Sequence, residues 1–584
     1  MWNASKAVLL GLGLLLAQGV SAYTHHVSSI QWMAYSDAAF ARAQAENKPI
    51  FMLISAVWCY NCHIYEVTLD TPPVADTLNR AFIPIFVDYD RRQDLARAYP
   101  AVGIPVTVIL APNGEHLVSV PGAIAQTRLL ASLNKTLRFL ADEYRPEVVA
   151  ATKTAPKPLQ PLSRALLKNY LDRFDQQIST AFDPAYGGFG LAQKEPHAEL
   201  LLRLLERQRS GDQRWREPLR TTLDAILGPG KPTPAEPRPP FETLLRLRGQ
   251  QTDLLAAVQQ LQEQDKLTGL YDPLEGGFFR YATRRNWSVP HFEKMLLENV
   301  QLTELMLQAA LQFNQANYRE AADTSLGYLL SHLYDEETGG FFGSQGADEV
   351  YYHLTRKERA QVSPPPVDRT SYAVSSARAL ITLLQAARLL DERRYLSWAT
   401  QAADFLTTRM VGERGAYSYF DPKKVDPKKV DPKKADPKEL DPAHDLPRLD
   451  GQLTDNAWLA EALLMTYQAT GEKRYLDSAE RIIGFAATHL YDPESGAFYS
   501  RHSGSSSAYR AGEQLLRTKE LEDNGQMAKA LHRVFQITGK ANYREMLEGT
   551  AGYFFSAVQQ GEFNASSATW QQLAEQLLAS GRYP

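Results

Sequence analysis

Two cysteines carry the most distinctive chemistry of this chain. Cys59 and Cys62 stand in the segment Trp58-Cys-Tyr-Asn-Cys-His63 and are the only cysteines among 584 residues. A disulfide across so short a loop holds little chain together, so a purely structural bridge explains the pair poorly. The preceding run, Lys48–Ser55, is apolar in the manner of a buried strand. A strand that delivers Cys-x-x-Cys to the start of a helix places the first thiol at the positive end of the helix dipole, which lowers its pKa.

The same segment also reads as Cys-x-x-Cys-His, the attachment motif of c-type haem, and an inert pair of thiols is a third interpretation. The chain that follows favours a thioredoxin-type dithiol. Residues 79–88 predict a helix end and a strand, and residues 91–99 predict a further helix. The Ile104-Pro105 bond stands where such folds place a cis proline beside the dithiol. Residues 106–120 form a predicted hairpin around Pro112-Asn113-Gly114.

In this interpretation each residue around the dithiol has a role. Cys59 attacks a partner disulfide, and Cys62 resolves the mixed disulfide. Pro105 lies against the sulfurs, and His63 adds positive charge when it is protonated. Trp58 either covers one side of the dithiol or packs in the core. The expected partner is therefore a protein disulfide or dithiol.

The N-terminus predicts export. Residues 1–22 combine Lys6, an apolar run over 7–17 and the cleavage site Val20-Ser-Ala22, which is the pattern of a signal peptide; an uncleaved anchor is the alternative. No later run reaches the ~18 apolar residues of a membrane helix, so no stable membrane insertion is expected after cleavage. We expect a periplasmic or secreted protein. The net charge of −4 and the lack of a basic block argue against a nucleic-acid partner.

Composition divides the rest of the chain into three further parts. Residues 23–144 form the predicted thioredoxin-like domain, and residues 145–161, rich in proline, form a linker. Residues 162–584 have a helical pattern throughout. Within them, residues 421–442 repeat Asp-Pro-Lys-Lys with almost no apolar side chain, which predicts an extended loop outside any core.

The helical part contains two repeats. One is a helix start with an aromatic residue at its third or fourth position, found at Trp215, Tyr318, Tyr395, Tyr475 and Tyr543. The other is a turn of the form Asp-x-x-x-Gly-Gly-Phe, which begins near residues 183, 272, 335 and 492. Asp-Pro opens a turn and glycine permits positive φ. Together they predict helical hairpins, and about a dozen helical stretches favour six hairpins closed into an (α/α)6 toroid with the glycine turns around one mouth.

These features resemble a family that joins a thioredoxin-like domain to a six-hairpin glycosidase-like toroid. It includes the animal spermatogenesis-associated thioredoxin-like proteins and uncharacterised bacterial relatives. Its motifs are matched by the dithiol segment and by Gly276–Tyr281, Trp287–Leu296, Asn299–Leu302, Ser344–Asp348 and Leu453–Leu459. The chain departs from the family pattern at Phe279, Gly346, Tyr372-Ala373 and Lys194-Glu195-Pro196. The resemblance implies the fold class: an α/β thioredoxin-like domain followed by an all-α (α/α)6 toroid.

In the toroid the best polar cluster is Pro290–Lys294, at the expected start of an inner helix. Tyr281 and Trp287 are candidates to stack on a sugar, and His291 and Glu293 to bind hydroxyl groups. Glu293 as a helix cap is the structural alternative. No spacing of His, Cys, Asp or Glu suggests a metal site, and no cofactor is expected.

The predicted function is a secreted thiol-disulfide oxidoreductase whose toroid binds a target, with a glycan or glycoprotein as the candidate. The alternative is a carbohydrate-active enzyme, hydrolase or epimerase, with an accessory thioredoxin-like domain.

Overall fold

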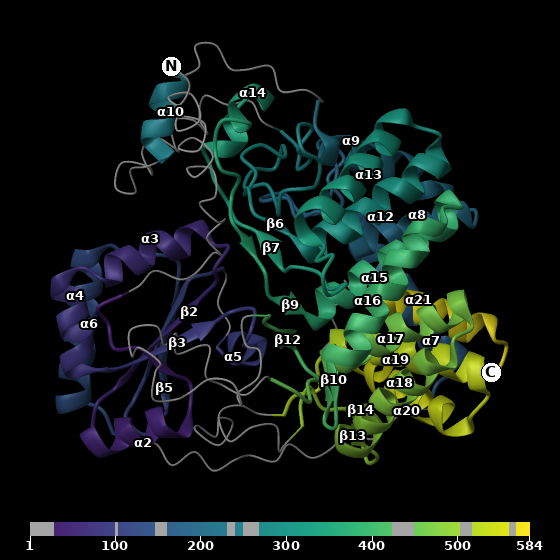
Figure 1. Ribbon diagram of the computed structural model, residues 1–584. Helices are drawn as coiled ribbons and strands as arrows, with labels where there is room; N and C mark the ends of the chain where they lie inside the picture. The colour runs from purple at the N-terminus through teal and green to yellow at the C-terminus, as the bar shows by residue number, and fades with distance from the viewer. Residues whose placement is uncertain are drawn as a thin grey trace, which may run out of the picture.

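The computed structural model describes residues 28–99, 103–145, 161–229, 240–248, 268–422, 449–502, 517–559 and 568–583. A small α/β domain and a larger helical domain lie side by side (Figure 1). The predicted signal peptide, nearly all of the linker and most of the Asp-Pro-Lys-Lys array lie outside the described residues.

The N-terminal domain is built on a five-stranded sheet in the order β1-β3-β2-β4-β5. β2 pairs parallel with β3 and antiparallel with β4. β4 and β5 form the hairpin that the sequence predicts. The strands are Met33–Ala34 (β1), Ile50–Ser55 (β2), Ile83–Asp88 (β3), Val106–Leu110 (β4) and His116–Pro121 (β5).

Helices cover both faces of this sheet. Ile50 and Met52 of β2 pack toward α2 and α5, whereas Phe51 and Leu53 pack toward α3, α4 and α6. β2 and β3 are therefore buried at every residue, which explains why the sequence of β2 is continuously apolar rather than alternating. The helices are Asp37–Glu46 (α2), Tyr60–Leu69 (α3), Pro72–Ala81 (α4), Gln93–Ala98 (α5) and Gln126–Asp142 (α6).

The helical domain is a closed double ring. Among the described residues, the inner ring is formed by Ala198–Arg209 (α8), Leu296–Phe313 (α12), Ala373–Leu390 (α15), Leu453–Thr470 (α17), Leu521–Thr538 (α19) and Ala568–Ala579 (α21). Each inner helix contacts the next, and α21 contacts α8, which closes the ring. The outer helices are Arg164–Ala181 (α7), Arg216–Leu227 (α9), Ala316–Tyr328 (α13), Arg393–Arg409 (α16), Lys473–His489 (α18) and Ala541–Gln559 (α20). The predicted (α/α)6 toroid is confirmed.

Small elements occupy the segments between these helices. They are the helices Phe241–Arg248 (α10) and Arg356–Arg359 (α14), the single turns Gln213–Trp215 (η1), Leu329–Leu333 (η2) and Tyr351–His353 (η3), and the strands Lys294–Met295 (β6), Ser344–Gln345 (β7), Val367–Asp368 (β8), Ser371–Tyr372 (β9), Val411–Gly412 (β10), Gly415–Ala416 (β11), Tyr419–Phe420 (β12), Tyr491–Asp492 (β13) and Ala497–Phe498 (β14).

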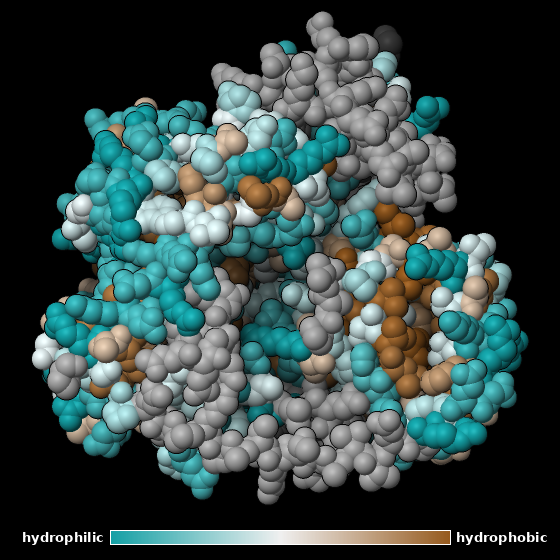
Figure 2. Space-filling view, turned by 180° about the vertical axis from the view of Figure 1, so that it is seen from behind, coloured by the Kyte–Doolittle hydropathy of each residue, from teal (hydrophilic) through white to brown (hydrophobic). Residues whose placement is uncertain are grey.

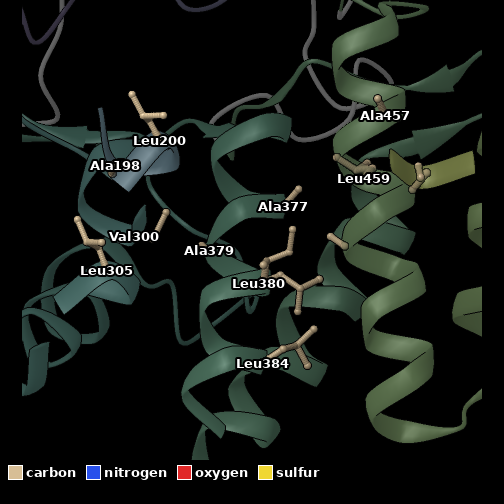
Figure 3. Packing of buried hydrophobic residues seen from close by; sticks show 14 of the residues in the cluster. Ala198, Leu200, Val300, Leu305, Ala377, Ala379, Leu380, Leu384, Ala457 and Leu459 are labelled. Carbon is tan, nitrogen blue, oxygen red and sulfur yellow. The ribbon is translucent and has the colours of Figure 1, made fainter. Parts of the chain in front are cut away.

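Apolar side chains fill the space between neighbouring inner helices. Figure 3 shows leucine, valine and alanine side chains of α8, α12, α15 and α17 that lie at successive helix contacts. Within the described part of the chain, α15 alone has the length and composition of a membrane span, and 61% of that span is buried inside the protein.

The tyrosine repeat joins neighbouring outer helices. Tyr318 near the start of α13 donates a hydrogen bond to Asp224 of α9, at 2.7 Å. Tyr475 of α18 donates to Asp404 of α16, and Tyr543 of α20 donates to Glu480 of α18, both at 2.9 Å. Three members of the repeat therefore link neighbouring outer helices, whereas the hydroxyl of Tyr395 accepts a hydrogen bond from Arg394, its neighbour in the chain.

The glycine turns stand at the end of the ring where the inner helices begin. At Gly276, a Cβ atom would lie 2.5 Å from the carbonyl oxygen of Thr324, so the turn packs directly on the backbone of α13. The buried ammonium of Lys294 donates to Asp272 at 2.8 Å and to the carbonyl of Gly276 at 2.7 Å, which ties the turn to the start of α12. Lys294, part of the polar cluster of the sequence, thus has a structural role.

Candidate redox site between the two domains

Cys59 and Cys62 form a disulfide at the start of α3, with their Cα atoms 5.2 Å apart. Cys59 is the N-cap of α3, and its sulfur accepts a hydrogen bond from the backbone N–H of Cys62 at 3.2 Å. The sulfur of Cys59 therefore lies where the helix dipole and a backbone donor both favour a thiolate. The local geometry is that of the predicted dithiol.

The N-terminal domain supports the disulfide from two further sides. The Ile104–Pro105 peptide bond is cis, and the carbonyl oxygen of Ile104 lies 3.9 Å from the sulfur of Cys59. His63 Nε2 lies 2.7 Å from the carbonyl oxygen of Val57, so this nitrogen is the donor. The same ring lies 3.9 Å from Glu66, which accepts a hydrogen bond from Ser55 at 2.5 Å.

The disulfide is not open to solvent, because the toroid covers it. Cys59 is 4% exposed and Cys62 is 0% exposed. Met295 of the toroid packs against the cluster formed by the two cysteines and Ala56, Val57 and Trp58. Nothing in the local sequence indicates this cover, since a dithiol at the end of a strand is ordinarily on the surface of its own domain.

Trp58 contacts the toroid as well. The guanidinium carbon of Arg280 lies 4.5 Å from the centre of the Trp58 ring, which is a cation–π contact. Burial lowers the pKa of Arg280, but the carboxylates of Glu293 and Glu298 outweigh burial and raise it above its ordinary value. Arg280 is therefore a permanent cation beside the residue that precedes Cys59.

Tyr60, on the other side of Cys59, faces carboxyl groups of the toroid. Its buried hydroxyl has no hydrogen-bond partner among the described residues. Burial, followed by the charges of Glu349 and Asp348, raises the pKa of Tyr60. Burial and the neighbouring Glu293 also raise the pKa of Glu349 well above its usual range.

Ion pairs bind the two domains together on the far side of Trp58. Arg91 donates to Asp421 at 2.9 Å and to Thr370 at 3.2 Å. Arg97 donates to Asp523 at 2.7 Å. Asp421 is the first residue of the Asp-Pro-Lys-Lys array, and it is buried in this contact rather than lying in a loop outside the core.

A cavity of about 280 Å³ lies beside these ion pairs, between α5 and the mouth of the toroid. Its walls include Asp90 and Arg97 of the N-terminal domain and Ser418 and Asp455 of the toroid. Asp455 accepts a hydrogen bond from Ser418, and burial raises its pKa to about 7. Asp90 also accepts a hydrogen bond from the indole of Trp58 at 2.7 Å, so one carboxyl links the cavity to the cover of the dithiol.

The space-filling view shows where this region lies. Hydrophilic residues line the hollow between the two domains, whereas hydrophobic residues gather on part of the lobe at the right (Figure 2). Polar walls between the domains and a polar cavity at the toroid mouth are both compatible with a water-soluble target.

The toroid residues that the sequence singles out divide into two groups. Tyr281 and His291 stack on each other with ring centres 4.3 Å apart, and Glu293 lies 3.7 Å from His291; all three adjoin Arg280. Trp287 is instead 1% exposed and donates to the carbonyl of Tyr186 at 2.9 Å, so its ring packs in the interior. α12 has no side-chain cap, so Glu293 does not cap it.

Sequence reasoning missed Arg280, Arg91, Arg97 and Met295. Arg280 has a signal, because it lies inside the matched segment Gly276–Tyr281. Met295 has a similar signal, because it lies inside the matched segment Trp287–Leu296. Arg91 and Arg97 lie in no such segment, and only the contact between the domains gives them a role.

Comparison with known proteins agrees with this geometry. Residues 15–157 match the family model Thioredox_DsbH, described as a protein of unknown function, DUF255. The chain carries a DsbH-type thioredoxin-like domain. This match places the dithiol in a known kind of domain, and the name of the family assigns no activity.

Relatives extend the likeness beyond that domain. The chain is 25% identical over 512 residues to human spermatogenesis-associated protein 20, a match that covers 81% of this chain and 60% of the relative. For the mouse protein of the same name the identity is 27% over 393 residues, covering 61% of this chain and 45% of the relative. The chain thus spans less than two thirds of the length of these relatives.

Solved structures with a similar fold include D-mannose isomerase, with a TM-score of 0.46, 11% identity and coverage of 68% of this chain and 87% of that chain. Cellobiose 2-epimerase from Spirochaeta thermophila has a TM-score of 0.45 and 13% identity, and the match covers 66% of this chain and 84% of that chain.

Proposed function

We propose that this protein is a thiol-disulfide oxidoreductase whose dithiol works inside the contact between the two domains. The observation that carries the proposal is the position of Cys59, at the N-cap of α3, beside the Ile104 carbonyl and against the toroid. A helix N-terminus activates a thiol, and a resolving thiol three residues along completes the exchange centre.

The reaction follows from these positions. In the reduced protein, the Cys59 thiolate attacks one sulfur of a partner disulfide, forms a mixed disulfide and releases the other partner sulfur as a thiolate. Cys62, once it has lost its proton to solvent, attacks the sulfur of Cys59. The Cys59–Cys62 disulfide forms, and the second partner sulfur leaves as a thiolate. The partner gains two electrons and two protons, and the dithiol loses them.

The cover over the dithiol restricts the partner. With the cysteines 4% and 0% exposed, a folded protein cannot present a disulfide to Cys59 while the domains stay in contact. Either a small disulfide or an extended segment enters, or the domains separate first. The toroid would then select the target at its mouth, where the hydroxyl, amide and carboxyl groups around the cavity suit a hydroxylated ligand such as a glycan.

We further propose that the protein acts in the periplasm or outside the cell, from the signal-like pattern of residues 1–22. Fractionation of cells that produce the full chain, with the N-terminus of the product sequenced, tests this proposal. Product confined to the cytoplasm with residues 1–22 retained would refute it.

Thiol exchange is tested with the purified protein and two substrates, oxidised glutathione and insulin. Cys59→Ser should abolish exchange, and Cys62→Ser should accumulate a mixed disulfide that mass spectrometry detects. The redox proposal fails if the wild type and Cys59→Ser exchange disulfides at the same rate. A preference for glutathione over insulin would support the restriction imposed by the cover.

A further inference from the structure

We infer that Arg280 of the toroid is a positioning residue of the redox site: it holds Trp58 over the dithiol and supplies the cation that stabilises the Cys59 thiolate. The inference rests on the proposed function and deepens it, because it makes the redox centre a composite of both domains. Without the toroid, the thioredoxin-like domain would have a less acidic attacking thiol.

The first support is geometric. Arg280 stands over the indole of Trp58 at 4.5 Å, and Trp58 is 2% exposed and adjacent to Cys59 in the chain. The backbone N–H of Arg280 donates to the carbonyl of His291 at 3.1 Å, which fixes the start of the side chain. Met295, from the segment that leads into α12, packs beside the two cysteines. One small region of the toroid therefore provides both the apolar cover and the cation.

The second support is the balance of charge. From the toroid, the groups that face Arg280 are Glu293, Glu298 and Tyr281, and from the N-terminal domain they are Tyr89 and Asp90. Burial raises the pKa of Glu298 and, with Asp88 and Asp368, raises that of Asp90 well above its usual range. His291 and Arg280 hold the pKa of Glu293 below its usual value, although burial opposes them.

Among these groups Glu293 alone has a lowered pKa, and its carboxylate lies 3.7 Å from His291. Arg280 keeps its charge at every accessible pH. Its contact with Trp58, the neighbour of Cys59 in the chain, brings this cation to the redox site, and a cation near a thiolate lowers the pKa of the thiol where water is excluded.

The test measures the pKa of Cys59 in the reduced protein by ultraviolet thiolate absorbance, in a Cys62→Ser background that leaves one thiol. Arg280→Gln should raise the pKa of Cys59 by about one unit. Arg280→Lys should restore most of the shift because it retains the charge. Glu293→Gln should move the pKa in the opposite direction, since it removes the charged carboxylate, and this arm remains available if Arg280→Gln does not fold.

The matched control is Arg285→Gln. Arg285 lies five residues along, stands 5.4 Å from the ring of Tyr186 and pairs with Asp183 at 2.8 Å, so it is an arginine of the same loop that makes the same kinds of contact away from the dithiol. Its replacement should leave the pKa of Cys59 unchanged. An unchanged far-ultraviolet circular dichroism spectrum and a cooperative unfolding transition in each variant show that the fold is retained.

An unchanged pKa of Cys59 in folded Arg280→Gln would overturn the inference, as would equal shifts in Arg280→Lys and Arg280→Gln. These results differ from failure of the proposed function, in which the wild-type dithiol does not exchange with any disulfide although its thiol pKa can still be measured. The second readout is the equilibrium constant between the Cys59–Cys62 dithiol and glutathione, measured in the wild type and in Arg280→Gln. In Arg280→Gln this constant should fall about tenfold from the wild-type value, toward that of an unactivated thiol.

Discussion

Arg91→Met should open the contact between the two domains. Arg91 is 8% exposed, donates to Asp421 and Thr370, and stands 5.3 Å from the ring of Tyr419. Methionine keeps most of the apolar volume but removes the guanidinium that pairs with Asp421 and Asp88. Removal of one partner from a buried ion pair costs about 3–5 kcal/mol.

That cost falls on the closed arrangement, because Arg91 and Asp421 belong to different domains. At the lower figure, about 3 kcal/mol, the ratio of open to closed molecules rises roughly a hundredfold, since each ~1.4 kcal/mol is a factor of ten. The disulfide is buried under the toroid, so its reduction should proceed through the open form. We therefore expect Arg91→Met to speed reduction of Cys59–Cys62 by up to about a hundredfold.

The assay follows loss of the disulfide over time with a small reductant and, separately, with a protein reductant. Arg214→Met is the control: Arg214 makes ion pairs with Asp175 and Asp212, but it is 62% exposed and distant from the contact, so its loss should cost less than about 1 kcal/mol and leave reduction unchanged. Asp421→Asn should also speed reduction, and its effect should not add fully to that of Arg91→Met.

Reduction at the wild-type rate in Arg91→Met, by both reductants, would refute the reasoning. It would mean that the disulfide is reached without separation of the domains. A faster reaction with the small reductant alone would indicate a local opening beside Trp58.

Three further predictions concern the fold and the cavity. Burial raises the folded-state pKa of Asp455 from its ordinary value of 3.8 to about 7, so the folded protein holds this proton more tightly than the unfolded chain, and wild-type stability should fall as pH rises from about 4 to 7. Asp455→Asn should remove that part of the pH dependence when both proteins are compared by chemical denaturation. Parallel curves of stability against pH would contradict this prediction. Gly277→Ala should lower stability by about 2–3 kcal/mol, because the backbone is at φ 77° and a Cβ would lie 2.7 Å from the Tyr328 ring. The control is Gly327→Ala: a Cβ at Gly327 would have no atom within 4 Å, so this change should be neutral or stabilising. Replacement of residues 423–442 by a short Gly/Ser loop that keeps Asp421 should change stability by less than about 1 kcal/mol, and a large drop in Tm would show that the array packs.

The sequence by itself determined the parts that depend on neighbours along the chain. The apolar run 50–55 predicts a buried strand, which the structure confirms as β2, and the Cys-x-x-Cys pair that follows it begins α3 at the predicted place. The tyrosine repeat and the glycine turns revealed the ring, because each hairpin must make the same contacts with the next, as Tyr318 and Gly276 do. These patterns depend on residues close together in the chain, so they can be recognised in the sequence without knowledge of the fold.

Only the tertiary structure decided what the dithiol faces. Arg91 meets Asp421 across 330 residues of sequence and Arg97 meets Asp523 across 426, and no local pattern pairs charges at such separations. Arg280 stands over Trp58 because the N-terminal domain packs its dithiol segment against the toroid segment that precedes α12. The burial of Cys59, the near-neutral pKa of Asp455 and the raised pKa of Glu349 follow in turn, since each depends on which surface excludes water from the group.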